Sequence, residues 1–255
     1  MKRRRRLGQH LLKDPEILDR IVEAAHLSKD SVVFEIGTGE GDLTVRLCRY
    51  AGQVISTEID RSMFEVAASN LHGCRNLELI LGDGFSVNRS FNVLVSNIPY
   101  SRSRQFVEWL VERRPERAVV TIQKEFGDKL LAEPGADNYR AVTVVAQAFF
   151  QVTWLFDVGR EAFSPPPQVD STVLLLQPRR EDVQADLQLV SSLKTLFSFR
   201  GRQVSSALKH IFRDEEARLE LLREAFGVEM LRKRVEHLTV DEAVTIAKQL
   251  VKSTE

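Results

Sequence analysis

The sequence predicts an α/β fold, in which a Rossmann-like sheet of mostly parallel strands is followed by a small all-helical domain. Short apolar runs, several of them rich in β-branched residues, alternate with amphipathic stretches, a pattern typical of buried parallel strands and their helices. Glycine or polar residues follow directly where several of these runs end. From about residue 180 onward only amphipathic stretches remain, without strand-like alternation. We therefore expect one domain over residues 1–180 and a helical domain over residues 181–255.

The composition is that of a globular protein, with 43% hydrophobic and 28% charged residues over 255 positions. Lys and Arg number 36, as do Asp and Glu, so the net charge of zero excludes no class of partner. The basic residues gather in two places, near the start at Arg3, Arg4, Arg5 and Arg6 and late in the chain at Arg200, Arg202, Lys209 and Arg213. Such local runs can bind phosphates. The alternative for the first run, within a tail of residues 1–8, is a solvated segment.

Several classes of protein are not expected. No apolar run approaches the roughly 20 residues that span a membrane, and no apolar segment follows the charged start as in a secretory signal. Cys48 and Cys74 lack metal-ligand spacing and are expected to be free thiols in a reducing compartment. The histidines show no metal-binding pattern either. We expect a cytoplasmic, metal-free protein, and nothing suggests more than a monomer.

A glycine-rich turn follows the first expected strand, Val32 to Ile36. Glycines at residues 37, 39 and 41 allow the backbone to turn tightly and to approach a ligand closely. The spacing is G-x-G-x-G and not the G-x-G-x-x-G that binds a dinucleotide pyrophosphate. The turn therefore argues against NAD and favours a ligand without a phosphate. An ordinary structural turn between strand and helix is the alternative.

Acidic side chains stand at the ends of the next two expected strands. Glu58 lies 21 positions after Gly37, close to the offset of about 20 at which a carboxylate reaches ribose hydroxyls. Asp83 follows the expected strand over 77–81, where it could accept from an adenine amino group. The alternative for Asp83 is a turn-forming role.

The fourth expected strand, over 91–95, ends in Asn97-Ile98-Pro99-Tyr100. This turn supplies an amide acceptor, a main-chain carbonyl held by a proline-stiffened turn and a flat stacking surface, which suit a planar base with an exocyclic amine. A simple strand exit with a structural Tyr100 is the alternative. Ligands of open α/β sheets bind outside the carboxyl ends of the strands. The four strand ends together describe an adenosine without phosphate, and hence S-adenosylmethionine.

Two further segments flank this expected site. Asp14 and Pro15 open a helix, and the polar residues Gln9 and His10 before it are either loop filler or a lid over a pocket. Later, three prolines stiffen the segment from Phe163 to Ser171, which lies between two expected strands over 148–157 and 172–176 that form a hairpin-like pair. Phe163 is either held over a pocket or packed into the core.

These motifs together resemble the rRNA adenine N6-dimethyltransferases of the kasugamycin-resistance type. The similarity runs in family order from residue 8 to about 210. Its parts are Gly8-Gln9-His10-Leu11-Leu12, Glu35 to Gly41, Asn97 to Tyr100, the Phe163 to Ser171 segment, and Phe199-Arg200-Gly201-Arg202. Leu11 replaces the usual Phe, Gln168 the usual Lys, and Gly201 and Gln203 interrupt a stretch that is usually more basic.

The resemblance implies dimethylation at N6 of two adjacent adenines in the 3′-terminal hairpin loop of small-subunit rRNA, coupled to small-subunit biogenesis. It implies catalytic roles for Asn97, Ile98, Pro99, Tyr100 and Phe163. It implies cofactor contacts at Gln9, His10, Leu12, Gly37, Gly39, Glu58, Ile59, Asp83, Gly84 and Asn97. Arg3 to Arg6, Arg200 and Arg202 would contact rRNA. Two alternatives stay open: a large-subunit rRNA adenine N6-methyltransferase of the resistance type, against which Tyr100 argues because Phe is usual there, and an assembly factor with secondary methylation.

Overall fold

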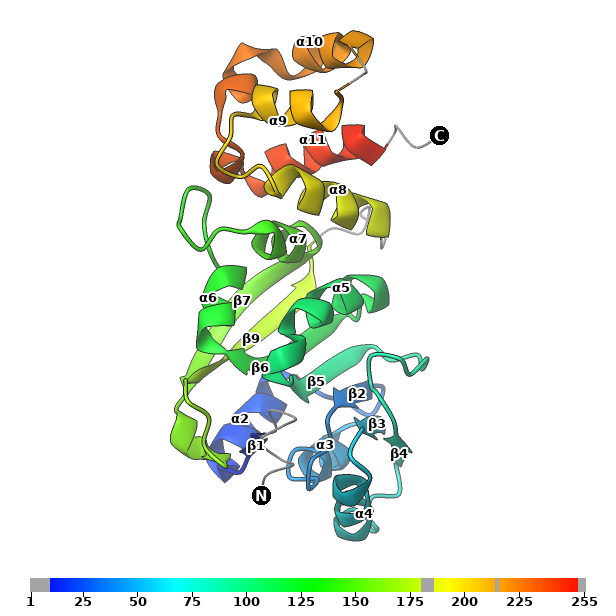
Figure 1. The fold of residues 1–255 in the computed structure, drawn as a ribbon. Coiled ribbons are helices and arrows are strands. Elements are labelled where there is room, and N and C mark those ends of the chain that lie inside the picture. The colour runs from blue at the N-terminus through cyan, green and yellow to red at the C-terminus, as the bar shows by residue number, and fades with distance from the viewer. Residues whose placement is uncertain (1–9, 180–185, 214–215, 252–255) are drawn as a thin grey trace.

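The computed structural model, which describes residues 10–179, 186–213 and 216–251, contains a seven-stranded sheet in the order β4-β3-β2-β5-β6-β9-β7 (Figure 1). The strands are β2 (Val32–Ile36), β3 (Gln53–Glu58), β4 (Leu77–Leu81), β5 (Val93–Asn97), β6 (Arg117–Gln123), β7 (Phe150–Val158) and β9 (Ser171–Pro178). Neighbours among β4, β3, β2, β5 and β6 are parallel, and β9 is antiparallel to both β6 and β7. The predicted α/β class and the antiparallel final pair are confirmed.

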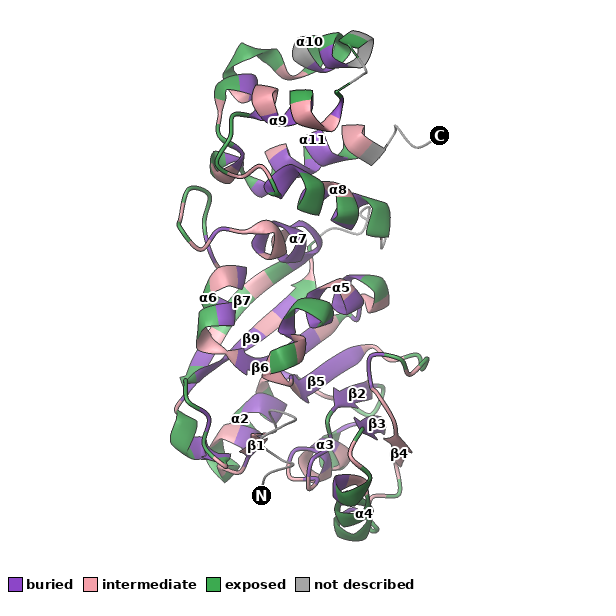
Figure 2. Ribbon diagram, in the orientation of Figure 1, coloured by how far each residue is buried: buried purple, intermediate pink, exposed green. Residues whose placement is uncertain are grey.

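Helices cover both faces of this sheet, because successive residues of a strand point to opposite sides. Phe34 and Leu94 belong to one hydrophobic cluster with α5, α6 and α7, whereas their neighbours Val33 and Val93 belong to a second cluster with α2 and α3. Strands β2 and β5 are accordingly buried nearly throughout (Figure 2). The helices between the strands are α2 (Pro15–Ala24), α3 (Thr44–Tyr50), α4 (Arg61–Asn70), η1 (Tyr100–Arg102), α5 (Ser103–Arg113), α6 (Lys124–Leu130), α7 (Ala141–Phe149) and η2 (Arg160–Ala162).

The chain after β9 consists of helices joined by turns, with no strand in its described part, as the sequence predicted. Its elements are α8 (Leu187–Phe197), α9 (Val204–Ile211), α10 (Glu216–Arg232), η3 (Val235–His237) and α11 (Val240–Val251). They stack beyond α7, at the end of the molecule opposite α4 (Figure 1). Leu193 of α8 and Ile246 of α11 share one apolar cluster with Val145 of α7. The helical part therefore packs directly on the helices that cover the sheet. A division into two domains near residue 180 stays a prediction.

Two very short strands join distant segments at the edge of the sheet domain. β1 (Leu11–Leu12) pairs antiparallel with β8 (Phe163–Ser164), so the segment before α2 is tied to the proline-rich segment. The main-chain N–H of Lys13 extends this contact by donating to the Ala162 carbonyl at 2.8 Å. This pairing was not predicted, because strands of two residues leave no periodic pattern. Helix α2 begins as predicted, with the Asp14 carboxylate accepting from the main chain and Pro15 at the first position.

None of the helices in the described ranges combines the length and apolar character needed to cross a membrane.

Candidate active site

The carboxyl ends of β2, β3, β4 and β5 open into one cavity. Most of the residues predicted to bind cofactor or substrate line it: His10, Gly37, Gly39, Glu58, Ile59, Asp83, Gly84, Asn97, Ile98, Pro99 and Tyr100. The rest of the lining, to which sequence reasoning had assigned no site role, is formed by Leu11, Ile36, Thr57, Gly82, Phe85, Ser101 and Arg102. The predicted convergence of four strand ends is therefore present in the structure.

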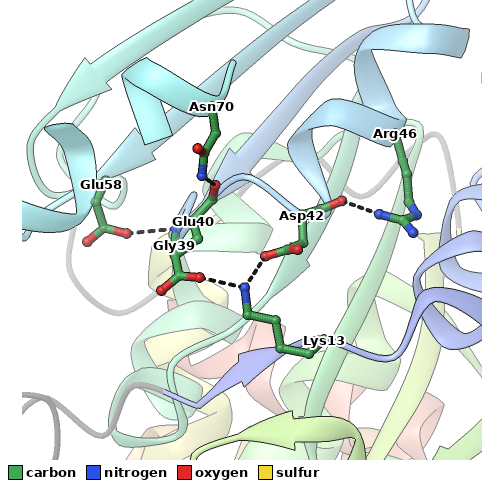
Figure 3. Close-up of polar contacts among 7 residues, drawn as sticks. All are labelled: Lys13, Gly39, Glu40, Asp42, Arg46, Glu58 and Asn70. Carbon is green, nitrogen blue, oxygen red and sulfur yellow. Dashed lines mark hydrogen bonds and ion pairs between the residues drawn. The ribbon is translucent and has the colours of Figure 1, made fainter. Parts of the chain in front are cut away.

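The glycine-rich turn after β2 is held in place from several sides. The N–H groups of Gly37 and Thr38 both donate to the Thr57 carbonyl, at 2.8 and 2.9 Å. Lys13 bridges Glu40 and Asp42 from below the turn, at 2.6 Å to each carboxylate (Figure 3). Gly39 has a φ of +60°, and a Cβ placed there would lie 2.7 Å from Leu11 Cδ2. The turn thus needs glycine both for its backbone conformation and for contact with the β1 segment.

Glu58 ends β3 with its carboxylate almost fully buried. Its Oε2 accepts from Gly39 N at 2.9 Å (Figure 3). Its Oε1 accepts from Asp60 N at 2.9 Å. Burial raises the pKa of Glu58 above its ordinary value, while the two main-chain donors favour the ionised form. Each oxygen keeps a further lone pair that could accept a ribose hydroxyl.

Asp83 follows β4 and is held by two donors. Its Oδ1 accepts from Phe85 N at 3.0 Å, and its Oδ2 accepts from Arg102 Nη2 at 2.9 Å. Both oxygens retain accepting capacity, so an amino group in the cavity could still bind there. The turn-forming and ligand-binding readings of Asp83 are thus compatible, since the carboxylate already caps its own turn.

Asn97 ends β5 with its amide held in one orientation. Its Nδ2 donates to the main-chain oxygen of His10 at 3.0 Å. Its Oδ1 is buried and has no hydrogen-bond partner among the residues that the structure describes. A buried acceptor without a partner costs free energy, on the order of 1–3 kcal/mol, and such groups call for an explanation such as a ligand. Asn97 Oδ1 is therefore a ready acceptor for a donor that enters the cavity.

His10 and Tyr100 complete this side of the cavity. The two rings stack with centroids 5.6 Å apart, and His10 Nδ1 lies 2.8 Å from the Pro165 carbonyl. The Tyr100 hydroxyl contacts Ser171 Oγ at 2.5 Å, and burial raises the pKa of the phenol, which is therefore neutral. His10 thus joins the turn after β5 to the proline-rich segment. This geometry supports the lid reading of His10 over loop filler.

Beneath the cavity lies the buried carboxyl of Glu35 in β2. Burial raises its pKa to about 8, although Ser56 and Thr44 hydroxyls both donate to its Oε2 at 2.6 Å. Ser56 Oγ in turn lies 2.6 Å from Thr38 Oγ1 in the glycine-rich turn. Glu35 therefore anchors β3, α3 and the turn to one another from inside the protein.

Some predicted site residues lie outside the cavity lining or outside the described residues. Leu12 is buried in the core behind the cavity, and its neighbour Leu11 takes the place at the lining. Phe163 pairs with Leu12 and is only 3% exposed, so its ring packs in the core in this structure. Its role over the target base stays a prediction. Gln9 and the basic residues Arg3 to Arg6 fall outside the described residues.

Arg200 and Arg202 lie in the turn after α8, within the helical part. Arg200 pairs with Glu236 at 3.1 Å, and the Arg202 guanidinium contacts the His210 ring. Arg202 is exposed, whereas Arg200 is partly buried. Arg202 is therefore the more accessible of the two for a phosphate, and the RNA contact of both stays a prediction.

The residues present fit an adenosyl group with a reactive centre near Asn97. A Cβ at Gly37 would meet no atom within 4 Å, so the backbone there faces open space that a ligand can approach closely. Glu58 and Asp83 offer acceptors for ribose and amine, and Asn97 Oδ1 lacks a partner among the described atoms. Within the described chain, no group of three or more His, Cys, Asp and Glu side chains could hold a metal ion.

Comparison with known proteins agrees with this geometry. The family model described as ribosomal RNA adenine dimethylase matches residues 1–252. A probable ribosomal RNA small subunit methyltransferase A of Methanopyrus kandleri is 36% identical, over 96% of this chain and 91% of its own. The ribosomal RNA small subunit methyltransferase A of Thermotoga maritima is 37% identical, over 95% of this chain and 84% of its own.

Solved structures give the same result. A dimethyladenosine transferase from Plasmodium falciparum superposes with a TM-score of 0.83 at 31% identity, covering 95% of this chain and 97% of its own. The 23S rRNA methyltransferase ErmE superposes with a TM-score of 0.70 at 28% identity, covering 94% of this chain and 99% of its own. With a family match over nearly the whole length and relatives above 30% identity, the chain belongs to the ribosomal RNA adenine dimethylase family.

Proposed function

We propose that this protein transfers methyl groups from S-adenosylmethionine to N6 of two adjacent adenines in the 3′-terminal hairpin loop of small-subunit rRNA, two to each base. The observation that carries the proposal is the buried Asn97 Oδ1, an acceptor without a partner among the described residues, at the end of a cavity suited to an adenosyl group. The relatives named as small subunit methyltransferases and the dimethyladenosine transferase support the choice of substrate.

The chain's own residues would hold the cofactor at three strand ends. Glu58 accepts the ribose hydroxyls and Asp83 the adenine amine, while the glycine-rich turn lets the backbone approach closely. His10 and Ile59 line the same cavity and complete the contacts. The bound S-adenosylmethionine supplies an electrophilic methyl group on its sulfonium.

The turn after β5 would hold and activate the target base. The lone pair of an adenine amine is delocalised into the ring, so the amine is a poor nucleophile. Hydrogen bonds from its protons to Asn97 Oδ1 and to the Ile98 carbonyl draw it toward a tetrahedral, more nucleophilic form. Tyr100 stacks on the base, and Pro99 stiffens the turn. Orientation of this kind is worth roughly 7–11 kcal/mol in favourable systems.

We assign Phe163 to the other face of the target base, opposite Tyr100. Because its ring is buried in the structure, this role requires the proline-rich segment to move when the base arrives. The target must also leave its stack, which favours a loop over a duplex.

The rRNA phosphates would meet the basic residues Arg3 to Arg6, Arg200 and Arg202, together with the helical domain. The turn between α8 and α9, which carries Arg200 and Arg202, lies beyond α7, toward the end of the molecule far from β1 (Figure 1). Bound RNA would thus extend from the cavity along the helical domain. We further propose that the protein acts as a cytoplasmic monomer on the immature small subunit.

A second candidate function rests on the likeness to ErmE, a 23S rRNA methyltransferase, at 28% identity. A third, an assembly factor with secondary methylation, shares all the same residues. Both leave the cofactor site unchanged. The second differs in the RNA presented to it, whereas the third binds the same immature small subunit and has methylation as a secondary task.

The experiment offers methyl-labelled S-adenosylmethionine with three acceptors: small subunits lacking dimethyladenosine, large subunits, and a free adenine-containing hairpin. Digestion and mass spectrometry then locate and count the methyl groups. We expect N6,N6-dimethyladenosine in the 3′-terminal hairpin loop of the small subunit. Methylation confined to large-subunit rRNA would replace the proposal by the second candidate. Tight small-subunit binding without methylation would leave the third.

A further inference from the structure

A guanidinium closes the end of the cavity at which we place the adenine. Arg102 is the last residue of η1, two positions beyond Tyr100, and it lines the same cavity as Asp83. Its Nη2 donates to Asp83 Oδ2 at 2.9 Å, with the two side chains 32% and 31% exposed. This ion pair links the turn that carries Asn97 and Tyr100 to the turn after β4. The proposed roles of the cavity residues leave Arg102 without a function.

Arg102 is fixed by more than this one contact. Its guanidinium carbon lies 4.7 Å from the centroid of the Phe85 ring, a cation–π distance. Its Nε donates to Gln105 Oε1 at 2.6 Å. In a usual surface ion pair, two long side chains lose conformational entropy and contribute little free energy. The Arg102 guanidinium differs because a carboxylate, an aromatic ring and an amide all hold it.

The ion pair with Arg102 also orients the Asp83 carboxylate, and this orientation decides which purine can bind to it. Phe85 N binds Oδ1 and Arg102 binds Oδ2, so both oxygens are oriented. A carboxylate oriented in this way only accepts hydrogen bonds. A purine with an amino group at C6 can donate to it. A purine with an oxygen at C6 would place one acceptor against another.

We propose that Arg102 is the residue that makes the nucleoside end of the cofactor site specific for adenine, by holding the Asp83 carboxylate aimed at the 6-amino group. The proposal rests on the assignment of Asp83 to the adenine amine under the proposed function. Arg102 acts through Asp83 and is a positioning residue. Its effect is on the choice of purine and not only on affinity.

The test measures binding of two product analogues by titration calorimetry: S-adenosylhomocysteine and its 6-oxo counterpart, S-inosylhomocysteine. Sites built to pair with a donor reject the analogue that lacks it strongly, and we expect the wild type to prefer the adenosyl compound by roughly 100-fold or more. In Arg102→Met the side chain keeps its length over Phe85 and loses its charge. We expect the preference to fall by about 10-fold or more, with adenosyl binding weakened.

Two further variants separate this role from loss of structure. Arg104→Met removes an exposed arginine two residues along the chain and should leave both affinities unchanged. Arg102→Lys keeps the charge but not the fork, and should recover part of the preference. Asp83→Asn should abolish the preference alone, and adding Arg102→Met to it should change the preference little further, because Arg102 acts through that one carboxylate.

Each contrary result has a distinct meaning. A preference unchanged in Arg102→Met, in a variant that melts at the wild-type temperature, would show that the ion pair is incidental. Tighter binding of S-adenosylhomocysteine in that variant would show that Arg102 competes with the adenine, which also overturns the proposal. A wild type without preference for the adenosyl compound would instead overturn the assignment of Asp83, and with it the basis for this role.

Discussion

The side-chain amide of Asn97 donates to the main-chain oxygen of His10 at 3.0 Å, across 87 positions of sequence. This bond decides which way the amide faces, because only Nδ2 can donate and Oδ1 is left on the other side. Oδ1 is buried there with no partner among the described residues. A main-chain group near the start of the chain therefore orients the acceptor at the end of β5, and the residues that hold His10 act on the chemistry indirectly.

Cofactor binding should depend on the close contact between Gly39 of the glycine-rich turn and Leu11 of β1. Gly39→Ala would place a Cβ 2.7 Å from Leu11 Cδ2, at a residue whose φ is +60°. We expect cofactor binding to weaken at least 10-fold, or about 1.4 kcal/mol, from clash and backbone strain together. Adding Leu11→Ala removes the clash but not the strain, so affinity should recover only in part. Calorimetry with S-adenosylhomocysteine measures both; no recovery in the double variant would refute the contact.

The Glu58 carboxylate should govern affinity and not the chemical step. In Glu58→Gln one oxygen becomes an amide that faces a main-chain N–H, and one ribose acceptor is lost. We expect the Kd for S-adenosylhomocysteine to rise about 10- to 100-fold, roughly 1.4–2.7 kcal/mol, while kcat at saturating cofactor stays near the wild type. The exposed Glu65 in α4 provides the matched control, Glu65→Gln. Unchanged affinity would remove Glu58 from the ribose site.

The buried Glu35 should make stability depend on pH. Its pKa is about 8 in the folded protein and close to 4.5 in the unfolded chain. Between these values the native state holds a proton that the unfolded state has released. The contribution of Glu35 to the free energy of unfolding should therefore be fully present below about pH 4.5, fall as the pH rises toward 8, by at most about 1.4 kcal/mol per pH unit, and level off above that.

Glu35→Gln should remove this part of the pH dependence, because the amide oxygen still accepts from Ser56 and Thr44 and carries no proton to lose. Urea unfolding from pH 5 to 8 gives the slopes. Glu112→Gln, at an exposed position of α5, should keep the wild-type slope. Identical slopes in wild type and Glu35→Gln would mean that Glu35 is ionised in the native protein at neutral pH.

RNA binding should lose salt dependence when an exposed arginine is removed. A phosphate contact contributes about 0.7–0.9 to the slope of log K against log salt concentration. We expect Arg202→Gln to lower the slope by that amount. Arg200→Gln also breaks the ion pair with Glu236 and should lower stability as well. Filter binding of the small-subunit hairpin across 50–300 mM salt measures the slopes; an unchanged slope in Arg202→Gln would place the RNA elsewhere.

The strand ends and the polar residues that follow them could be predicted from the sequence, because each is marked by a local apolar run that stops. Glu58, Asp83 and Asn97 stand where an apolar run stops, and parallel strands bring such positions to one edge. Residues 148 and 149 were wrongly assigned to a strand. They end α7, and β7 begins at Phe150, because a short apolar run does not distinguish a buried helix from a strand.

Other features depend on contacts between distant segments. The β1–β8 pair, the His10–Asn97 bond and the Arg102–Asp83 ion pair join positions that carry no shared signal in one sequence. For a related reason the sequence assigned Leu12 to the cofactor, whereas Leu11 lines the cavity and Leu12 lies in the core. Neighbouring residues of a strand face opposite sides, and only the pairing with β8 decides which of the two faces the core.

The most direct test of the account is methyl transfer by Asn97→Ala. Small subunits lacking dimethyladenosine are incubated with saturating cofactor and excess enzyme, and N6,N6-dimethyladenosine is counted by mass spectrometry; binding of S-adenosylhomocysteine is measured in parallel. Asn88→Ala, an exposed asparagine, serves as the control. We expect a loss of at least 100-fold in rate, about 2.7 kcal/mol, with cofactor affinity within a few-fold of wild type. Normal turnover in Asn97→Ala would contradict the role of its amide as the acceptor for the target amine.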